Sequence, residues 1–275
     1  MPIRVLMVCF SHREANFRLS LADPEAAQAD IVRLRDDLEA TIERNPGFRD
    51  ALAPIANLTA PCPLAASMAR AARLVGDVGP MAAVAGAVAA TVANFAIARG
   101  ETEVVIDNGG DLAVYAPRAV VIGVYGGPNS GLGDRLALRI EPRDRPVAVC
   151  ASSSRMGHSL SFGDCDLAVV VGRDGAVADA AATSAANQVH NEADIQPTLE
   201  RIAALPDIDG VLLARDGRVG VMGRTMPQLV RCRDDEVFCK ITGDSAALSN
   251  LCQPEGARPK HLVTQKAASP QTEPI

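Results

Sequence analysis

The chain has 275 residues, enough for one large domain or two small ones with a sizeable core. Hydrophobic residues make up 48% and charged residues 22%, as in ordinary globular proteins, whereas aromatic residues make up only 3% and tryptophan is absent. The core must therefore consist mostly of Ala, Val, Leu and Ile. The net charge of −6 and the lack of a basic stripe argue against nucleic acid as a partner.

The cysteines and two apolar runs indicate where in the cell the protein is expected. Seven cysteines, an odd number without a CxxC pair, argue against a zinc site and a disulfide scaffold, so we expect reduced thiols in a cytoplasmic protein. The apolar run at residues 5–10 is too short for a secretion signal. The uncharged run at residues 78–98 has the length of a membrane span, but its Ala, Val and Gly content favours a buried central helix and no membrane partner.

The first part of the chain predicts a pair of strands followed by three helices. The strands are expected over residues 4–10 and 16–21. Apolar residues at spacings of three and four then predict a helix from Pro24 to about residue 45, and an alanine-rich helix is expected over residues 63–75. The third helix, over residues 79–99, is apolar all round, so we expect it to be buried on every side.

Strands dominate the middle of the chain. Residues 103–116 predict a strand, a tight turn and a second strand, and the strand that begins at Leu167 is expected to end at an Asp-Gly turn. Further apolar strands are expected over residues 119–126, 136–142 and 147–153.

The last part of the chain predicts two helices and then two hairpins. The helices are expected over residues 177–190 and 195–205, and the hairpins over residues 209–223 and 229–241. Residues 254–275 are polar, rich in proline and without periodicity, so we expect them to be disordered.

This order of elements predicts an α+β fold, with mixed or antiparallel sheets packed against a buried Ala/Gly-rich helix. Because no linker or internal repeat divides the chain, residues 1–253 are expected to form a single domain. The apolar, alanine-rich helices also make a homodimer plausible.

Four segments carry residues suited to ligand binding. In "DNGGD", Asn108, Gly109, Gly110 and Asp111 suit either a hairpin turn or a close approach to a ligand, and local evidence favours the turn. In "ASSSRMGHSLSFGDCD", Ser152, Ser153 and Ser154 offer hydroxyls to phosphate and His158 is a candidate base, although a solvated loop is an equal alternative. A serine hydrolase is disfavoured because no G-x-S-x-G motif occurs.

The other two segments are helical. Asp179 and Thr183 lie four residues apart, so they share one helix face and offer two hard oxygen ligands for Mg²⁺. The simpler alternative is that Asp179 only stabilises the helix dipole. Gly79 and Pro80 would open a helix whose N-terminus could receive an anion, or would begin a tightly packed core helix.

The four segments, in the order "DVGPMAAVAG", "DNGGD", "SSSRMGHSLSFGDCD" and "ADAAATSAANQV", resemble the ApbE superfamily. Characterised members of this superfamily are FAD:protein FMN transferases, also called thiamine biosynthesis lipoproteins. The resemblance covers residues 75–189 and is stronger to the cytoplasmic ApbE-like branch. It implies an ApbE-like fold, Mg²⁺ at Asp179 and Thr183, and catalytic roles for His158 and Asp179.

The resemblance also implies that residues 108–111 line a pocket for a flavin or a phosphate. Three departures leave the transfer reaction open: Ala83 replaces a lysine, Asp107 replaces an asparagine, and no Asp-Pro pair follows His158. We therefore expect a protein that binds FAD, FMN or a related phosphorylated small molecule with Mg²⁺, with transfer or hydrolysis at a phosphate anhydride as the suggested reaction. The alternatives are a non-catalytic accessory protein in sulfur assimilation (homocysteine formation) or cofactor metabolism, and a scaffold whose small residues serve packing alone.

Overall fold

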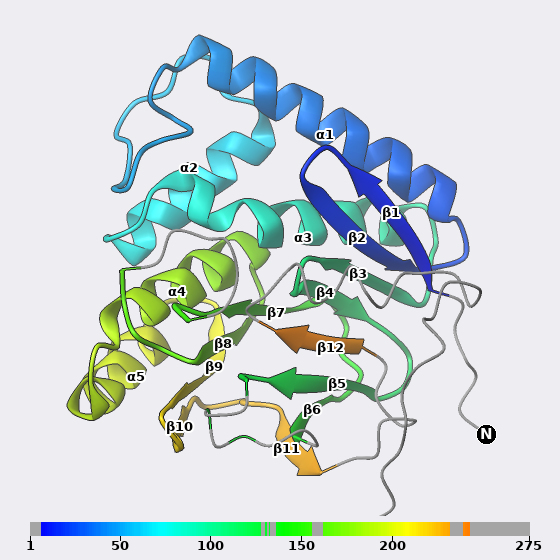
Figure 1. Ribbon diagram of the computed structural model, residues 1–275. Helices are drawn as coiled ribbons and strands as arrows, with labels where there is room; N and C mark the ends of the chain where they lie inside the picture. The colour runs from blue at the N-terminus through cyan, green and yellow to red at the C-terminus, as the bar shows by residue number, and fades with distance from the viewer. Residues whose placement is uncertain are drawn as a thin grey trace, which may run out of the picture.

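The computed structural model describes residues 7–127, 130, 132, 136–155, 162–231 and 239–242, the last of these as backbone only. Within this part of the chain, helices cover one face of a large sheet and a small sheet covers the other (Figure 1). The α+β class with mixed sheets and an Ala/Gly-rich helix is therefore confirmed.

The large sheet has eight strands, and every neighbouring pair in it is antiparallel. Its strands in spatial order are β1 (Val8–His12), β2 (Ala15–Ser20), β3 (Val104–Asn108), β4 (Asp111–Tyr115), β7 (Val147–Ser152), β8 (Leu167–Gly172), β9 (Ile208–Arg215) and β10 (Arg218–Met222). The small sheet has four strands, with β12 parallel to β5. Their order is β11 (Gln228–Arg231), β6 (Leu136–Ile140), β5 (Val120–Tyr125) and β12 (Cys239–Thr242).

The helices lie in two levels above the large sheet (Figure 1). α3 packs on β3 and β4, α4 packs on β7 and β8, and α5 packs on β9 and β10. α1 rests on α3, and α2 rests on α4. Their bounds are α1 (Pro24–Arg44), α2 (Pro63–Val75), α3 (Val84–Ala98), α4 (Gly175–Gln188) and α5 (Ile195–Ala203), with short 3-10 turns η1 (Pro80–Ala83) and η2 (Glu192–Asp194).

The alternation of strand side chains divides the core into two layers. In β8, Ala168 and Val170 face the helices, whereas Leu167, Val169 and Val171 face the small sheet. Because both faces are covered, β8 is apolar at every position, which explains its continuous run of Leu, Ala and Val.

Helices α3 and α4 cross with their backbones in contact. A Cβ on Gly86 would lie 2.3 Å from the carbonyl oxygen of Gly175, and one on Gly175 would lie 2.4 Å from the carbonyl oxygen of Gly86. Small residues are therefore required here, and they bring the side chains of α4 against the first turn of α3.

Several predicted elements need correction. The expected helix at residues 79–99 begins with the separate turn η1, and α3 is only partly buried; α4, with eleven buried residues, is the central helix. The apolar segment Pro80–Ala98 meets the length and hydropathy criteria for a membrane span, yet it packs against the sheet. The helix expected at 177–190 starts earlier, because Asp174 caps it instead of forming an Asp-Gly turn.

The hairpin expected at residues 229–241 is wrong. β11 pairs with β6 and β12 pairs with β5, so the two strands lie at opposite edges of the small sheet. Each strand finds its partner far away in the sequence, which a local pattern cannot reveal. By contrast, the pairing of the first two strands is confirmed between β1 and β2, although β1 extends to His12.

The expectation of reduced thiols is wrong at one of the four cysteines whose side chains the structure describes. Cys9 is disulfide-bonded, whereas Cys62, Cys150 and Cys165 are free. An odd count without a CxxC pair argues against a disulfide scaffold, but it does not exclude one bond between distant segments. The segment predicted to be disordered, residues 254–275, lies outside the described residues.

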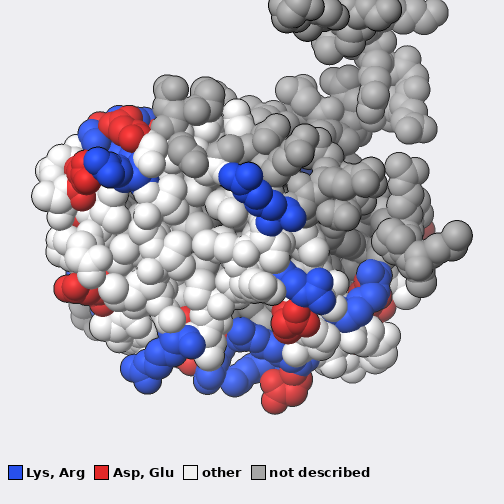
Figure 2. All heavy atoms as spheres, turned by 90° about the horizontal axis from the view of Figure 1, so that it is seen from below, with Lys and Arg blue, Asp and Glu red and all other residues white. Residues whose placement is uncertain are grey.

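Figure 2 shows the molecule from below. On this face several blue side chains lie along the lower margin with a few red ones beside them, and another blue side chain stands alone near the middle, with uncharged atoms between. The part of this face that the structure describes therefore carries no continuous basic surface.

Candidate functional site

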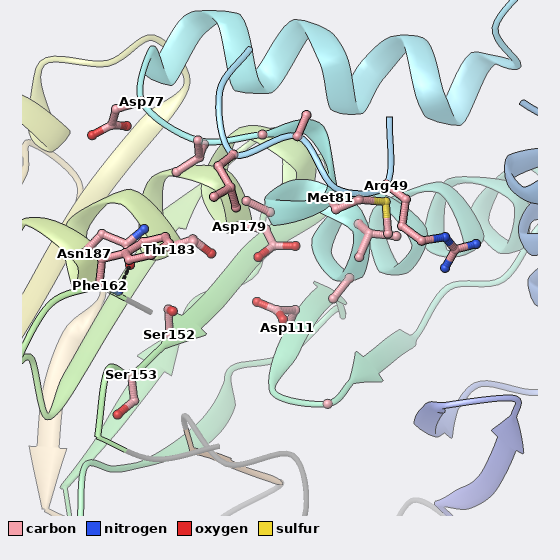
Figure 3. Close-up of a pocket in the computed structure, with 18 of the residues that line it drawn as sticks. Arg49, Asp77, Met81, Asp111, Ser152, Ser153, Phe162, Asp179, Thr183 and Asn187 are labelled. Atoms are coloured by element: carbon pink, nitrogen blue, oxygen red, sulfur yellow. Dashed lines mark hydrogen bonds between the residues drawn. The ribbon is translucent and has the colours of Figure 1, made fainter. Parts of the chain in front are cut away.

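A cleft of about 510 Å³ lies where α4 meets the start of α3 and the ends of strands of the large sheet (Figure 3). One wall comes from the strap, which we define as residues 45–62 between α1 and α2, and from the connection that follows α2. The opposite wall comes from the β3–β4 turn, the end of β7 and Phe162. α4 contributes Asp179, Thr183 and Asn187.

The spacing along α4 explains why these three side chains share the cleft. Positions 179, 183 and 187 are each one helical turn apart, and they line one face. The helix is fixed at its start because the Asp174 carboxylate accepts hydrogen bonds from the amides of Ala176 (2.9 Å) and Val177 (3.2 Å). Most of the remaining helix surface is alanine, buried against α2, α3 and the sheet.

Asp179 lies against the first turn of α3. Its Oδ2 accepts a hydrogen bond from the Gly86 amide at 2.8 Å, and the side chain is only 7% exposed. Burial raises the pKa of Asp179 to about 7, although the amides of Gly86 and Ala85 oppose that shift. The start of α3 therefore already faces a carboxylate of the protein itself at Gly86, whereas anion binding at the turn that Gly79 begins stays a prediction.

Asp111 is the second buried carboxylate of the cleft. Its Oδ1 accepts a hydrogen bond from the Ala151 amide at 3.2 Å. Burial, and next the nearby Asp179 carboxylate, raise the pKa of Asp111 well above its ordinary value. In Figure 3 the carboxylates of Asp111 and Asp179 point toward each other, and the Thr183 side chain points into the same space.

The glycine turn between β3 and β4 presents Asp111 to the cleft. Gly109 and Gly110 have φ of +68° and +109°, the left-handed conformations that a two-residue hairpin requires. The Asn108 amide donates a hydrogen bond to the Ala85 carbonyl at 3.2 Å, which ties the hairpin to the start of α3. The turn predicted for "DNGGD" is thus confirmed, and its Gly109 and Asp111 line the cleft, whereas contact with a ligand stays a prediction.

Asp107, the other carboxylate of the "DNGGD" motif, has a different environment from Asp111. Asp107 is fully buried and pairs with Arg18 on the neighbouring strand, whose Nε donates to Oδ2 at 2.7 Å. Its Oδ1 accepts a hydrogen bond from the Gly110 amide. Strand register brings Arg18 directly opposite Asp107, so this carboxylate is neutralised within the sheet and does not face the cleft.

The hydroxyl groups predicted to bind phosphate also separate into two sets. Ser152 and Ser153 line the cleft, whereas Ser154 donates a hydrogen bond to the Ala186 carbonyl at 2.9 Å and does not. Ser153 Oγ also accepts a hydrogen bond from the Arg155 amide at 3.1 Å. Within the described part of the chain, the hydroxyls of Ser152 and Thr183 have no hydrogen-bond partner, so both can contact a ligand.

The charges around the cleft are unbalanced. Arg49 is its one basic lining residue in the described chain; it pairs with Glu39, and in Figure 3 it points away from the carboxylates. At the margin of the cleft, the Asp77 carboxylate accepts hydrogen bonds from Ser184 (2.6 Å) and Gln188. A bare phosphate would therefore meet two carboxylates without an opposing cation.

The structure brings together most, but not all, of the predicted site residues. Those that line the cleft are Gly79, Gly109, Asp111, Ser152, Ser153, Asp179 and Thr183. Those that do not are Asn108, Gly110 and Ser154. His158 lies outside the described residues.

Sequence reasoning missed the strap, Asp77, Met81, Phe162 and Asn187. Asn187 could have been found, because it extends the four-residue spacing of Asp179 and Thr183 by one more turn. The strap has neither periodicity nor a motif, so no sequence signal places it at the cleft.

Residues 8–209 match the family model described as "AbpE bacteria". The chain belongs to this ApbE-like family. The UPF0280 protein of Methanocella arvoryzae is 37% identical over 214 residues, which cover 77% of this chain and 84% of the relative. The UPF0280 protein of Methanopyrus kandleri is 33% identical over 239 residues, or 84% and 95% of the two chains.

Solved structures show the same fold at low sequence identity. The flavin transferase ApbE from Vibrio cholerae superposes with a TM-score of 0.51 and 11% identity, covering 82% of this chain and 96% of that chain. The ApbE protein from Thermotoga maritima gives a TM-score of 0.50 and 11% identity, covering 78% and 96%. The ApbE-like architecture is therefore established for this chain.

The oxygen-rich centre of this ApbE-like cleft fits a hard cation. Two carboxylates and one hydroxyl converge there, and Mg²⁺ prefers such ligands. The described residues contain no group of three or more His, Cys, Asp or Glu side chains arranged for a metal, so water or ligand oxygens would have to complete the coordination. Mg²⁺ commonly keeps waters and substrate phosphates as ligands, which suits this partial set.

Proposed function

We propose that this ApbE-like protein binds a flavin nucleotide together with Mg²⁺ held by Asp111, Asp179 and Thr183, and that, when the ligand is FAD, water cleaves its phosphate anhydride to give FMN and AMP. The observation that carries the proposal is the pair of buried carboxylates that face each other in the cleft. Neither carboxylate has a cationic partner in the described part of the chain.

A divalent cation removes an electrostatic conflict at this site. Burial raises the pKa of both carboxyls above the ordinary value, and the nearby Asp179 charge raises that of Asp111 further. A bound cation reverses that preference, because it favours the ionised form of both groups. Mg²⁺ would also supply positive charge to the phosphate oxygens, where negative charge develops as an anhydride breaks.

The remaining cleft residues would position the ligand. Ser152 and Asn187 offer a hydroxyl and an amide on two walls, and the alanines of α4 allow a bulky group to come close. His158 remains the candidate base. The choice of a flavin nucleotide is supported by the family and by the neighbour in fold that is described as a flavin transferase.

Thermal denaturation tests the binding half of the proposal. FMN and FAD should raise the melting temperature more with Mg²⁺ than with EDTA, because a ligand that binds only the folded state stabilises it. Asp179→Asn should remove the Mg²⁺-dependent part of the shift. Asp37→Asn, which changes an exposed carboxylate on α1, serves as the matched control and should keep it. If neither flavin shifts the melting temperature under any condition, the proposal is wrong.

Chromatography tests the catalytic half. FAD incubated with Mg²⁺ and an excess of protein should yield FMN and AMP, and Asp179→Asn should suppress both products. Intact FAD after a long incubation would overturn the proposed cleavage and leave binding as the function.

A further inference from the structure

Two side chains at the cleft are unusually exposed for their type. Leu52 is 60% exposed and Phe162 is 57% exposed, and they are the two most exposed large hydrophobic residues in the described part of the chain. Both line the cleft. Single exposed hydrophobic residues are common on protein surfaces, so their meaning depends on how they are held and on what lies beneath them.

Both residues are held by ordered contacts. Leu52 follows Ala51 on the strap, and the carbonyl of Ala51 packs so closely on Gly79 that a Cβ there would lie 1.6 Å from its oxygen. The strap is further fixed by the fully buried Phe48. On the other wall, the Phe162 amide donates a hydrogen bond to Asn187 Oδ1 at 3.0 Å, drawn as the dashed line in Figure 3.

The chemical character of the lining therefore differs between the centre of the cleft and its exposed rim. Its centre carries the carboxylates of Asp111 and Asp179, whereas its exposed rim carries the apolar Leu52 and Phe162 beside the charged Arg49, Asp50 and Asp77. Phe162 is also the one aromatic side chain among the described lining residues. A ligand that matches this distribution has a charged end and a flat apolar end.

We infer that Leu52 and Phe162 form an apolar clamp for the flat ring of the ligand, with the ring at the mouth and the phosphate at the carboxylates. The inference rests on the proposed function, because the proposed Mg²⁺ is what would hold the phosphate end of the ligand at the carboxylates. Both flavin and adenine rings have a flat face that an aromatic side chain can contact, so the clamp predicts this shared chemistry.

The test compares ligands with and without a ring. FMN, AMP, riboflavin and inorganic pyrophosphate are each titrated into the full chain with Mg²⁺. Phe162→Ala should weaken the binding of FMN or AMP about tenfold, the loss expected when a ring loses an aromatic contact. It should leave the affinity for pyrophosphate unchanged. Leu52→Ala should act in the same direction, whereas Leu74→Ala, an equally apolar exposed change on α2, should alter neither affinity.

The outcomes separate the clamp from the proposed function. Unchanged FMN and AMP affinities in Phe162→Ala, or an equal loss for pyrophosphate, would overturn the clamp. Phe162→Tyr should keep ring binding, which shows that loss in the alanine variant comes from the ring and not from misfolding. If wild-type protein binds riboflavin through Phe162 but binds neither pyrophosphate nor Mg²⁺, the proposed function fails while the clamp stands.

Discussion

At the scale of single residues, three buried aspartates have different electrostatic partners. Asp107 is neutralised by Arg18, whereas Asp111 and Asp179 face each other without a cation in the described chain. The difference comes from strand register and from the crossing of α3 and α4, not from the residues themselves. An unpaired carboxylate in such a place costs stability unless it is protonated or binds a cation.

Replacement of Asp179 by asparagine should therefore stabilise the metal-free protein. Asparagine keeps the shape and can still accept the Gly86 hydrogen bond, but it removes one of two like charges. We expect the free energy of unfolding in EDTA at pH 8 to rise by up to about 4 kcal/mol, the scale of a carboxyl pKa shift of this size. Denaturant unfolding of both proteins measures it, and a loss of stability would show that the Asp179 charge supports the fold.

Thr183→Val isolates the contribution of one hydroxyl to cation binding. Valine matches threonine in shape, so the stability of α4 should change little, while Mg²⁺ affinity should fall about tenfold through the loss of one oxygen near the cation. Thr91→Val on α3 is the matched control, because its hydroxyl bonds the Ala87 carbonyl away from the cleft. Isothermal titration with Mg²⁺ compares the three proteins; equal affinities would remove Thr183 from the proposed site.

At the scale of elements, the strap and Gly79 depend on each other. The Ala51 carbonyl occupies the space where any side chain at position 79 would begin, so only glycine permits the contact. Gly79 thus acts on the cleft through the strap, which carries Leu52, more than through the helix start that the sequence suggested.

Gly79→Ala should consequently displace the strap. We expect it to lower the free energy of unfolding by about 2 kcal/mol or more through overpacking and to weaken flavin binding as well. Gly76→Ala is a useful control, because Gly76 ends α2 with φ of +96° and has open space around it. It should cost about 1 kcal/mol in backbone strain and leave ligand affinity intact. If both variants bind ligand equally well, the strap does not shape the site.

The elements also show which features of the fold and the site can be predicted from the sequence. Periodicity and caps predicted α1, α2 and most strands, because those signals are local. The spacing of Asp179 and Thr183 predicted a shared face, and the structure places both on the cleft. The partners of β11 and β12, the Arg18–Asp107 pair and the position of the strap depend on long-range packing, which no local pattern encodes.

At the scale of the whole molecule, the large sheet serves as the base on which distant segments meet. The hairpin at Asp111 ends at Tyr115 and the helix carrying Asp179 begins at Gly175, so 59 residues, which include β5, β6, β7 and β8, separate them. Because the two carboxylates come together only in the folded chain, their raised pKa values exist only there. Folding, proton binding and cation binding are therefore linked.

This linkage predicts the pH dependence of stability. A carboxyl whose pKa is higher in the folded state holds its proton more tightly there, so raising the pH through that interval favours unfolding. The pKa of Asp179 is about 7, against about 4 in an unfolded chain, so the metal-free protein should lose up to about 1.4 kcal/mol per pH unit between pH 4 and pH 7 and then level off. Asp111 contributes with the same sign.

Other groups do not cancel this effect in the same interval. Arg155 lowers the pKa values of Asp164 and Asp216, so those residues lose stabilising charge only as the pH falls below about 4.

Saturating Mg²⁺ should flatten the decline between pH 4 and pH 7, because the cation competes with the protons and binds more tightly as they leave. Unfolding curves at half-unit pH steps, with EDTA and with Mg²⁺, measure both slopes. Asp179→Asn should decline less steeply than the wild type in EDTA, because only Asp111 of the pair still titrates, and it should be indifferent to Mg²⁺. A wild-type profile that rises between pH 5 and pH 7 in EDTA would contradict the buried carboxylate pair as the dominant titrating site.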